Sequence, residues 1–152
     1  MKREIKFRGK SINSGEWLYG YLGEVKMSLF QRTYIDKVIF ENIGHFCTDN
    51  FGYVVSDYKV DPGTVGEYTG LKDKNGRDIY EGDIIECADS RGEPIRHFVE
   101  FCKERGYYAQ YLAGHSPLPA YEAGPIYQDY IDKLGKYVVG NVFDNPELLK
   151  TE

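Results

Sequence analysis

The chain has 152 residues, enough for one ordinary domain or for two small β units. Aromatic residues make up 15% of it, which favours strands over a helical bundle because aromatic rings pack well on half-buried strand faces. The net charge of −5 and the pI near 5.3 argue against a protein that coats nucleic acid, since such binding depends on neutralising phosphates.

The cysteines and the first residues indicate a reducing, aqueous location. Cys47, Cys87 and Cys102 are odd in number and not closely spaced, so we predict reduced, partly buried thiols rather than a disulfide framework. The charges of residues 1–6 precede no apolar stretch of the kind found in a secretory signal, and no segment approaches the ~20 apolar residues of a membrane span. We therefore expect a soluble cytoplasmic protein without membrane contact.

The first half of the chain predicts an N-terminal β unit. Residues 4–8 alternate charged and apolar side chains, as in a strand with Ile5 and Phe7 facing inward. A turn cluster separates this strand from an aromatic stretch at residues 17–22, which predicts a hairpin. Further strands are expected at residues 33–40, 43–47 and 51–55.

The strongest break in the first half is the turn sequence Asp-Pro-Gly at residues 61–63. It predicts an N-terminal hairpin unit over residues 1–62 and a second β unit over residues 63–152. One compact domain is the alternative.

The second half predicts closely spaced strands. Hairpins are expected from residues 65–69 with 78–80 and from residues 97–102 with 107–112. Between them, Gly82 is expected at positive φ and Asp83 is expected to bind backbone amides, just before a strand at residues 84–87. Strands this short suggest a small barrel.

A loop and short-helix insertion near residues 113–135 follows these hairpins. The predicted loop covers residues 113–123, and the helix covers residues 127–134 with Gly135 ending it. A last strand is expected at residues 137–143, and residues 145–149 predict a turn capped by Asn145. The predicted class is thus mostly β, with little helix.

One continuous segment resembles a known family. Residues 68–85, with the sequence YTGLKDKNGRDIYEGDII, closely resemble the signature of the YopX-like proteins of phages and prophages. Residues 3–8 and 139–149 resemble the family's opening and closing segments. The resemblance implies an SH3-like barrel, a bacterial host cytoplasm and a family with no established activity. It supplies no catalytic residues.

Within this segment, the residues predict structural roles. Turns are expected at three glycines and a core contribution from three apolar residues, and two aspartates lie in the turns, the second of which is expected to cap its turn. In that order they are Gly70, Gly76 and Gly82; Leu71, Ile79 and Ile84; and Asp73 and Asp83. A motif of this kind specifies a fold more than a site.

No catalytic or cofactor site is predicted. The phosphate-binding glycine loop and the nucleophile motifs are absent. His45 and Cys47, approached by His97 or Cys102, would be acceptable zinc ligands, but no Cys-x-x-Cys pair supports them and we predict no metal. A second weak candidate is acid–base catalysis by three clustered carboxylates. Acidic side chains are common in turns, however, so their clustering here does not by itself indicate catalysis. These carboxylates are Asp78, Glu81 and Asp83.

Two groups are candidate binding surfaces. Lys6, Arg8 and Lys10 share one strand face, a basic row that could follow a phosphate backbone or protect an edge strand from pairing. The second group is a set of tyrosines beside a proline loop, suited to protein interfaces although several must be core residues. Its members are Tyr107, Tyr108, Tyr111, Tyr121, Tyr127 and Tyr130.

The first hypothesis is a non-enzymatic, phage-type accessory protein that self-associates and binds an unidentified protein partner. Its oligomer contact is predicted on a surface around Tyr107, Tyr108 and Tyr111, because like charges on the basic row would repel across a two-fold interface. The alternatives are a nucleic-acid-binding β-barrel module, which the acidic net charge disfavours, and an enzyme of unrecognised type.

Overall fold

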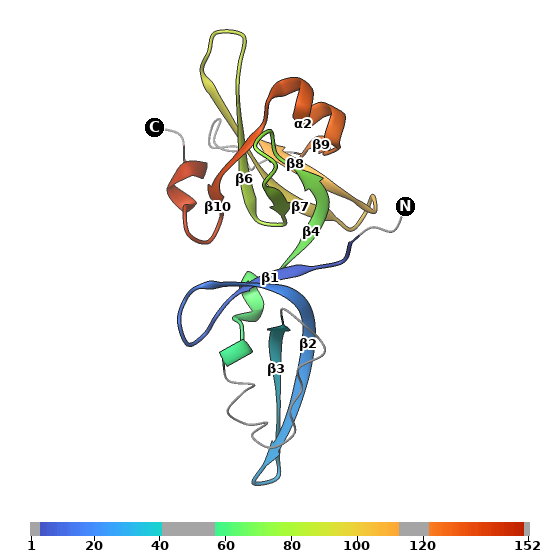
Figure 1. Cartoon of the computed structure of the whole chain (residues 1–152), viewed down its shortest axis with the longest axis vertical. Coiled ribbons are helices and arrows are strands. Elements are labelled where there is room, and N and C mark those ends of the chain that lie inside the picture. Colours follow the sequence, from blue (N-terminus) through green and yellow to red (C-terminus); the bar gives the residue numbers. More distant parts are fainter. Residues whose placement is uncertain (1–3, 41–56, 113–121, 151–152) are drawn as a thin grey trace. The chain divides into compact units, whose positions relative to one another are not determined.

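The computed structural model describes residues 4–40, 57–112 and 122–150, coloured in Figure 1. The predicted strands at residues 43–47 and 51–55 lie outside these ranges, as does most of the predicted loop at residues 113–123. The chain separates into two compact units, Met1–Glu67 and Tyr68–Glu152.

Unit 1 is built on a long antiparallel hairpin. Strand β1 (Phe7–Lys10) pairs with the start of β2 (Trp17–Leu29), which turns back into β3 (Arg32–Phe40), as Figure 1 shows. The two-residue turn between β2 and β3 holds Phe30 and Gln31 at φ 50° and 61°. Both central residues of a type I′ turn have positive φ, and Asn-Gly is the usual sequence there. The hairpin therefore closes on residues that are poorly suited to its turn.

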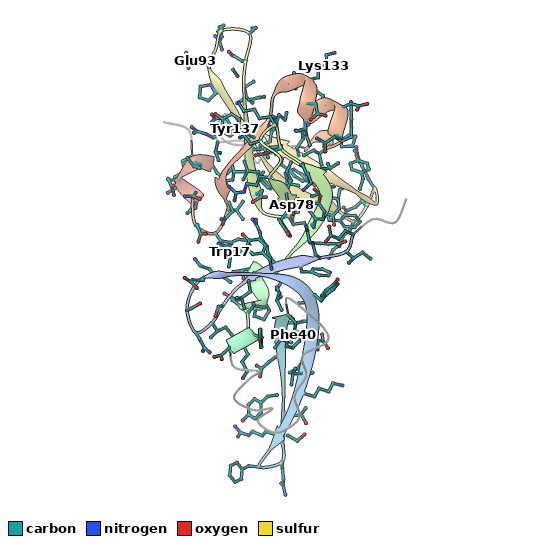
Figure 2. The ribbon with its side chains drawn as sticks, in the orientation of Figure 1. Trp17, Phe40, Asp78, Glu93, Lys133 and Tyr137 are labelled. Carbon is teal, nitrogen blue, oxygen red and sulfur yellow. The ribbon has the colours of Figure 1, made fainter. Side chains whose placement is uncertain are left out.

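The core of unit 1 lies where β1, β2 and β3 meet the segment around Val60. Val25 and Val38 form a buried cluster, and the partly buried Phe40, which is labelled in Figure 2, packs against it. The ring centroids of Phe40 and Tyr58 lie 5.1 Å apart. A Cβ atom on Gly9 would lie 3.0 Å from both Ile39 Cδ1 and Val60 Cβ. The chain therefore needs a residue without a side chain at position 9 for these elements to approach.

The predicted inward orientation of Ile5 is wrong, since its side chain is 58% exposed. Strand pairing begins only at Phe7, which lies opposite Gly20, so Ile5 has no sheet face on which to pack. Phe7 itself is half-buried.

Unit 2 contains a small hairpin and a five-stranded antiparallel sheet. The hairpin joins β4 (Gly66–Lys72), whose first two residues belong to unit 1 and pair with β1, to β5 (Asp78–Tyr80). The sheet has the strand order β10-β6-β7-β8-β9. Its strands are β6 (Asp83–Ala88), β7 (Pro94–Cys102), β8 (Tyr107–Leu112), β9 (Glu122–Pro125) and β10 (Tyr137–Asn141).

The helix α2 (Gln128–Leu134) contributes Ile131 to the core of unit 2. It ends at Gly135, which has φ 60°, as the sequence predicts. The core residues are Ile79, Ile85, Val99, Tyr108, Ile126, Ile131 and Val138, with Leu71 packed against them. The described residues also contain two single-turn 3₁₀ helices, η2 (Pro62–Thr64) in unit 1 and η3 (Pro146–Leu149) near the C-terminus in unit 2. Asn145 occupies the predicted N-cap position of η3, with Pro146 following it, but its side chain makes no capping bond.

The mostly β class is confirmed, whereas the predicted SH3-like barrel is not found in the described residues. The sheet of unit 2 is open, because β9 and β10 lie at its opposite edges and do not pair with each other. Strand β9 falls partly in the predicted loop, and β10 ends two residues before the predicted strand does. Cys87 and Cys102 are buried free thiols, and Cys47 lies outside the described residues.

The segment at residues 68–85 forms the turns that organise unit 2. Asp73 is buried, and its Oδ1 accepts hydrogen bonds from the amides of Asn75 (2.8 Å) and Arg77 (2.9 Å). Its Oδ2 accepts a third bond, 3.0 Å long, from the amide of Val138 on β10. A single carboxylate thus closes the β4–β5 turn and attaches it to the edge of the large sheet.

The second turn of this segment contains Gly82 and Asp83, and both are held by hydrogen bonds to other parts of unit 2. Asp83 is fully buried, and its Oδ2 accepts a bond from the Tyr80 amide at 2.8 Å. The Gly82 amide donates to the Val99 carbonyl, and the Gly82 carbonyl accepts from the Val142 amide, both at 2.8 Å. Gly82 makes these bonds at φ 82°, the positive value that the sequence predicts.

Replacing Gly82 tests this conformation directly. We expect Gly82→Val to lower the free energy of unfolding by about 1–3 kcal/mol, because a β-branched side chain is strained at positive φ. Gly82→Asn is the matched control and should cost less, since asparagine tolerates the left-handed region. Urea denaturation measures both, and equal losses for the two variants would contradict this account.

Candidate functional site

A cluster of polar side chains lies inside unit 2, and the sequence did not predict it. Lys136 is fully buried between the end of α2 and the start of β10. His97 on β7 and Gln110 on β8 are also buried. Strand pairing places His97 opposite Ile85 and Gln110 opposite Val99, so both side chains share the sheet face that forms the core.

Lys136 is the centre of this cluster. Its Nζ donates a hydrogen bond to Gln110 Oε1 at 2.6 Å, lies 3.5 Å from His97 Nδ1 and is 4.9 Å from the ring centroid of Tyr130. Burial lowers the pKa of the Lys136 ammonium, and the nearby Cys87 opposes this effect more weakly. Burial, followed by the charge of Lys136, lowers the pKa of His97 to about 4. At neutral pH the imidazole is therefore uncharged.

The backbone of Lys136 shows what the cluster does. Its amide donates to the Ile131 carbonyl on α2 at 3.0 Å, and its carbonyl accepts from the Lys74 amide in the β4–β5 turn at 2.9 Å. One residue thus ties the helix, the turn and two strands together. An amine with a lowered pKa is chemically suited to attack carbonyls, but this one is sealed in the core. The cluster is therefore a structural centre.

One signal in the sequence could have revealed Lys136. Counting back two residues from the buried Val138 on β10 places position 136 on the inward side, even though lysine is usually exposed.

The candidate metal ligands do not converge in the described residues. His97 and Cys102 are five positions apart on β7, which places them on opposite faces of the sheet. His45 and Cys47 lie outside the described residues. Across residues 4–40, 57–112 and 122–150, no three His, Cys, Asp or Glu side chains are grouped so that they could hold a metal.

The three clustered carboxylates have separate structural partners. Asp78 forms an ion pair with Lys72, and Asp83 binds the Tyr80 amide. Glu81 Oε1 accepts a bond from the Phe101 amide at 3.1 Å. Each acid therefore supports a neighbouring backbone segment or strand pair.

The basic row at the N-terminus is interrupted. Arg8 is only 2% exposed, and its guanidinium carbon lies 4.8 Å from the ring centroid of Trp17. Lys6 pairs with Glu4 at 3.3 Å, and Lys10 is half-buried. The central charge of the predicted row therefore does not lie on the surface.

The predicted tyrosine surface also needs correction, because Tyr108 belongs to the core of unit 2 and meets Phe101 edge to face at 5.2 Å. Its inward position follows from its pairing with Phe101 on the core side of the sheet. Tyr111 is half-buried and stacks on Phe98, also at 5.2 Å. Tyr107 is half-buried and accepts a bond from Arg105 at 3.0 Å.

The remaining predicted tyrosines differ in their exposure to solvent. Tyr127 is exposed and its ring lies 5.6 Å from that of the half-buried Tyr130, whereas Tyr121 is outside the described residues.

Exposed apolar side chains gather instead on the β2–β3 hairpin of unit 1. Beyond Gly20, where pairing with β1 ends, we call residues 21–40 the hairpin arm. Phe30 at its tip is 92% exposed, and Tyr34 and Ile35 are 49% and 56% exposed. An ion pair between Glu24 and Lys37 joins the two strands. These exposed residues could not be predicted from the sequence, because the alternation of side chains along a strand does not show which face is covered.

The comparison with family models agrees with this architecture. The model described as YopX protein matches residues 6–150, nearly the whole chain. The chain belongs to the YopX family. Residues 68–85, which build the turns of unit 2, lie within the matched range. No curated protein matches the chain.

A solved structure has a similar fold. The crystal structure of protein EF1440 from Enterococcus faecalis is similar, with a TM-score of 0.53 and 22% sequence identity. The match covers 98% of this chain and 100% of that one. At this identity the likeness concerns the fold alone. In the described part of this YopX protein, no helix has the length and apolar character to span a membrane.

The low pKa of His97 predicts that acid destabilises the protein. The unfolded chain takes up this proton near pH 6.5 and the folded chain only near pH 4, so the unfolded state binds more protons between these values. We expect the free energy of unfolding to fall by on the order of 2 kcal/mol across this range through His97. Above pH 7, His97 should contribute no pH dependence.

Denaturation at a series of pH values, compared with His97→Gln, isolates this effect. The difference in stability between wild type and variant should change between pH 6.5 and pH 4 and remain constant above pH 7. Parallel profiles for the two proteins would contradict the buried, neutral imidazole.

The bond between Lys136 and Gln110 predicts strong coupling. Lys136→Met leaves Gln110 Oε1 buried without its donor, and Gln110→Leu leaves the amine without its acceptor, so each should cost about 1–3 kcal/mol. The double variant should cost at least about 1 kcal/mol less than the sum, because it removes both polar groups. Urea denaturation of the four proteins measures the coupling, and additive losses would show that the bond contributes little.

Proposed function

We propose that this chain is a phage- or prophage-encoded accessory protein of the bacterial cytoplasm. It acts without catalysis, by self-association and by binding another protein. The observation that carries this proposal is the hairpin arm, which exposes Phe30, Tyr34 and Ile35. Exposed aromatic and apolar residues of this kind are typical anchors of protein interfaces.

The construction of the arm supports binding. Among the described residues, β2 beyond Gly20 pairs with β3 alone, and an isolated two-stranded hairpin is only marginally stable in water. Phe30 also stands at positive φ, which costs conformational energy for a residue other than glycine. A partner that covers the arm would offset both costs.

The two alternatives have weaker support. In nucleic-acid binding through the basic row, Arg8 could not contact a phosphate, because it is buried against Trp17. The net charge of −5 would also repel a polyanion. An enzyme would need reactive groups that a substrate can reach, whereas the amine of Lys136 is fully buried.

Site-specific photo-crosslinking in prophage-carrying cells tests the proposal. A photoreactive phenylalanine analogue replaces Phe30 in the full chain, and the adducts are identified by mass spectrometry. We expect a discrete adduct with a second protein species, because the Phe30 side chain is 92% exposed, more than any other large apolar side chain described in the arm. The matched control carries the analogue at Arg91, whose side chain is 81% exposed in the β6–β7 turn of unit 2.

Identical adducts from positions 30 and 91 would indicate non-specific collision and would contradict the proposal, as would the absence of any adduct from position 30. Adducts with a second copy are separated from adducts with another protein by their mass and peptides.

A further inference from the structure

We propose that β3 pairs with β3 of a second copy, forming an antiparallel two-fold contact centred on Tyr34. The inference rests on the self-association in the proposed function and assigns it a surface. Its partner is a second copy of this chain, and the recognition comes from backbone hydrogen bonds and complementary charges.

Strand β3 is the terminal strand in the hydrogen-bonded order of its sheet. At one end of β3, the outer edge is already hydrogen-bonded, because the Lys37 carbonyl accepts the Val60 amide at 3.0 Å. On that same side, no described residue pairs with residues 32–36. The stretch from Arg32 to Asp36 thus presents backbone donors and acceptors of the kind that pair with another strand.

The Lys37 bond also fixes which backbone groups are available. Its carbonyl points away from β2, and backbone groups alternate in direction along a strand, so those of Thr33 and Ile35 point the same way. In an antiparallel two-fold pair, Thr33 of each copy would then exchange both backbone bonds with Ile35 of the other. Tyr34 would face its own copy at the non-hydrogen-bonded position on the axis.

Charge selects this register over its neighbours. Centring the axis on Tyr34 places Arg32 of each copy opposite Asp36 of the other, giving two opposite-charge pairs, which stabilise an antiparallel ladder. Centring it on Thr33 places Arg32 opposite Tyr34, and centring it on Ile35 places Arg32 opposite Val38. Neither alternative pairs the charges. The sequence from Arg32 to Asp36 is therefore self-complementary in one register.

The exposed side chains fit the same contact. Tyr34 is 49% exposed and would meet its copy across the axis, while Ile35 is 56% exposed and would be covered by Thr33 of the other copy. Asp36 forms an ion pair with Lys59 at 2.8 Å, so its carboxylate is already held beside the edge. In the proposed dimer, Arg32 of the second copy would join the ion pair between Asp36 and Lys59.

The edge of the other sheet shows a contrast. Strand β9 ends in Pro125, which has no amide hydrogen to donate and so protects an edge from pairing. Strand β3 contains no proline along Arg32–Phe40. Because the proposed contact is short, we expect a reversible dimer rather than an obligate one.

A charge-reversal experiment tests the pairing. Arg32→Asp places two acids at each pair position, and Asp36→Arg places two bases there. Each variant alone should therefore dimerise about tenfold or more weakly than wild type, as measured by sedimentation equilibrium. Mixing the two variants restores opposite charges at both positions and should restore the dimer. The double variant, Arg32→Asp with Asp36→Arg, should also recover it.

Three variants, each with one introduced cysteine, test the register in a Cys47→Ser background, in which Cys87 and Cys102 stay buried. On mild oxidation, Tyr34→Cys should form a disulfide-linked dimer rapidly, because directly opposed non-hydrogen-bonded residues lie close enough for a disulfide. Thr33→Cys and Ile35→Cys should do so slowly, since neither faces its own copy. This measurement keeps the proposal testable if a charge variant does not fold, which circular dichroism would show.

The proposal is overturned if the wild-type chain remains monomeric up to about 1 mM, a concentration at which even weak contacts should be populated. It is also overturned if Arg32→Asp dimerises as wild type does, or if cysteine at position 33 or 35 crosslinks as fast as at position 34. Arg91→Asp is the control for a change of charge elsewhere and should leave dimerisation unchanged. A monomeric wild type that still crosslinks another protein from Phe30 would refute the β3 contact but not the proposed binding function.

Discussion

The carboxylate of Asp73 is the contact on which the architecture of unit 2 most depends. It is buried, and it accepts three backbone amides, two from its own turn and one from Val138 on β10. Buried carboxylates are tolerated when hydrogen bonds replace lost solvation, and here three do so. Next to this contact, the carbonyl of Lys136 accepts the Lys74 amide, so the turn and the sheet edge are joined twice. Residues 68–85 therefore hold the β4–β5 hairpin against β10, the edge strand of the five-stranded sheet.

The turns of unit 2 were predictable because their causes are local. Gly82 and Gly135 have positive φ, and both were placed correctly from the sequence, since glycine is the residue that adopts this conformation without strain. The helix α2 begins one residue later than predicted and ends where predicted. The mostly β class follows from the same kind of information, namely aromatic content and short periodic segments.

The candidate binding residues were less predictable, because burial depends on contacts that are distant in the sequence. Period-two alternation places Arg8 with Lys6 and Lys10, but it does not show that Trp17 covers Arg8. Tyr108 belongs to the core because its strand pairs with β7 on the side that faces Ile131 and Val138. Lys136 is buried against the strong preference of lysine for solvent, and its partners Gln110 and His97 lie 26 and 39 residues away. The exposure of the hairpin arm could not be predicted either, because it too depends on which distant segments cover each strand.

The bond from Val138 to Asp73 joins residues that are 65 positions apart, and this separation has a consequence for folding on the ribosome. The signature segment can form its local turns as soon as it emerges, but it cannot acquire the amide of β10 until that strand has been synthesised. During this interval the Asp73 carboxylate must stay hydrated and the facing core must stay open. Long-range closure of this kind slows folding and leaves apolar surface accessible to chaperones or to aggregation. Nascent chains halted before β10 should therefore remain open to proteases around the signature segment until that strand is added.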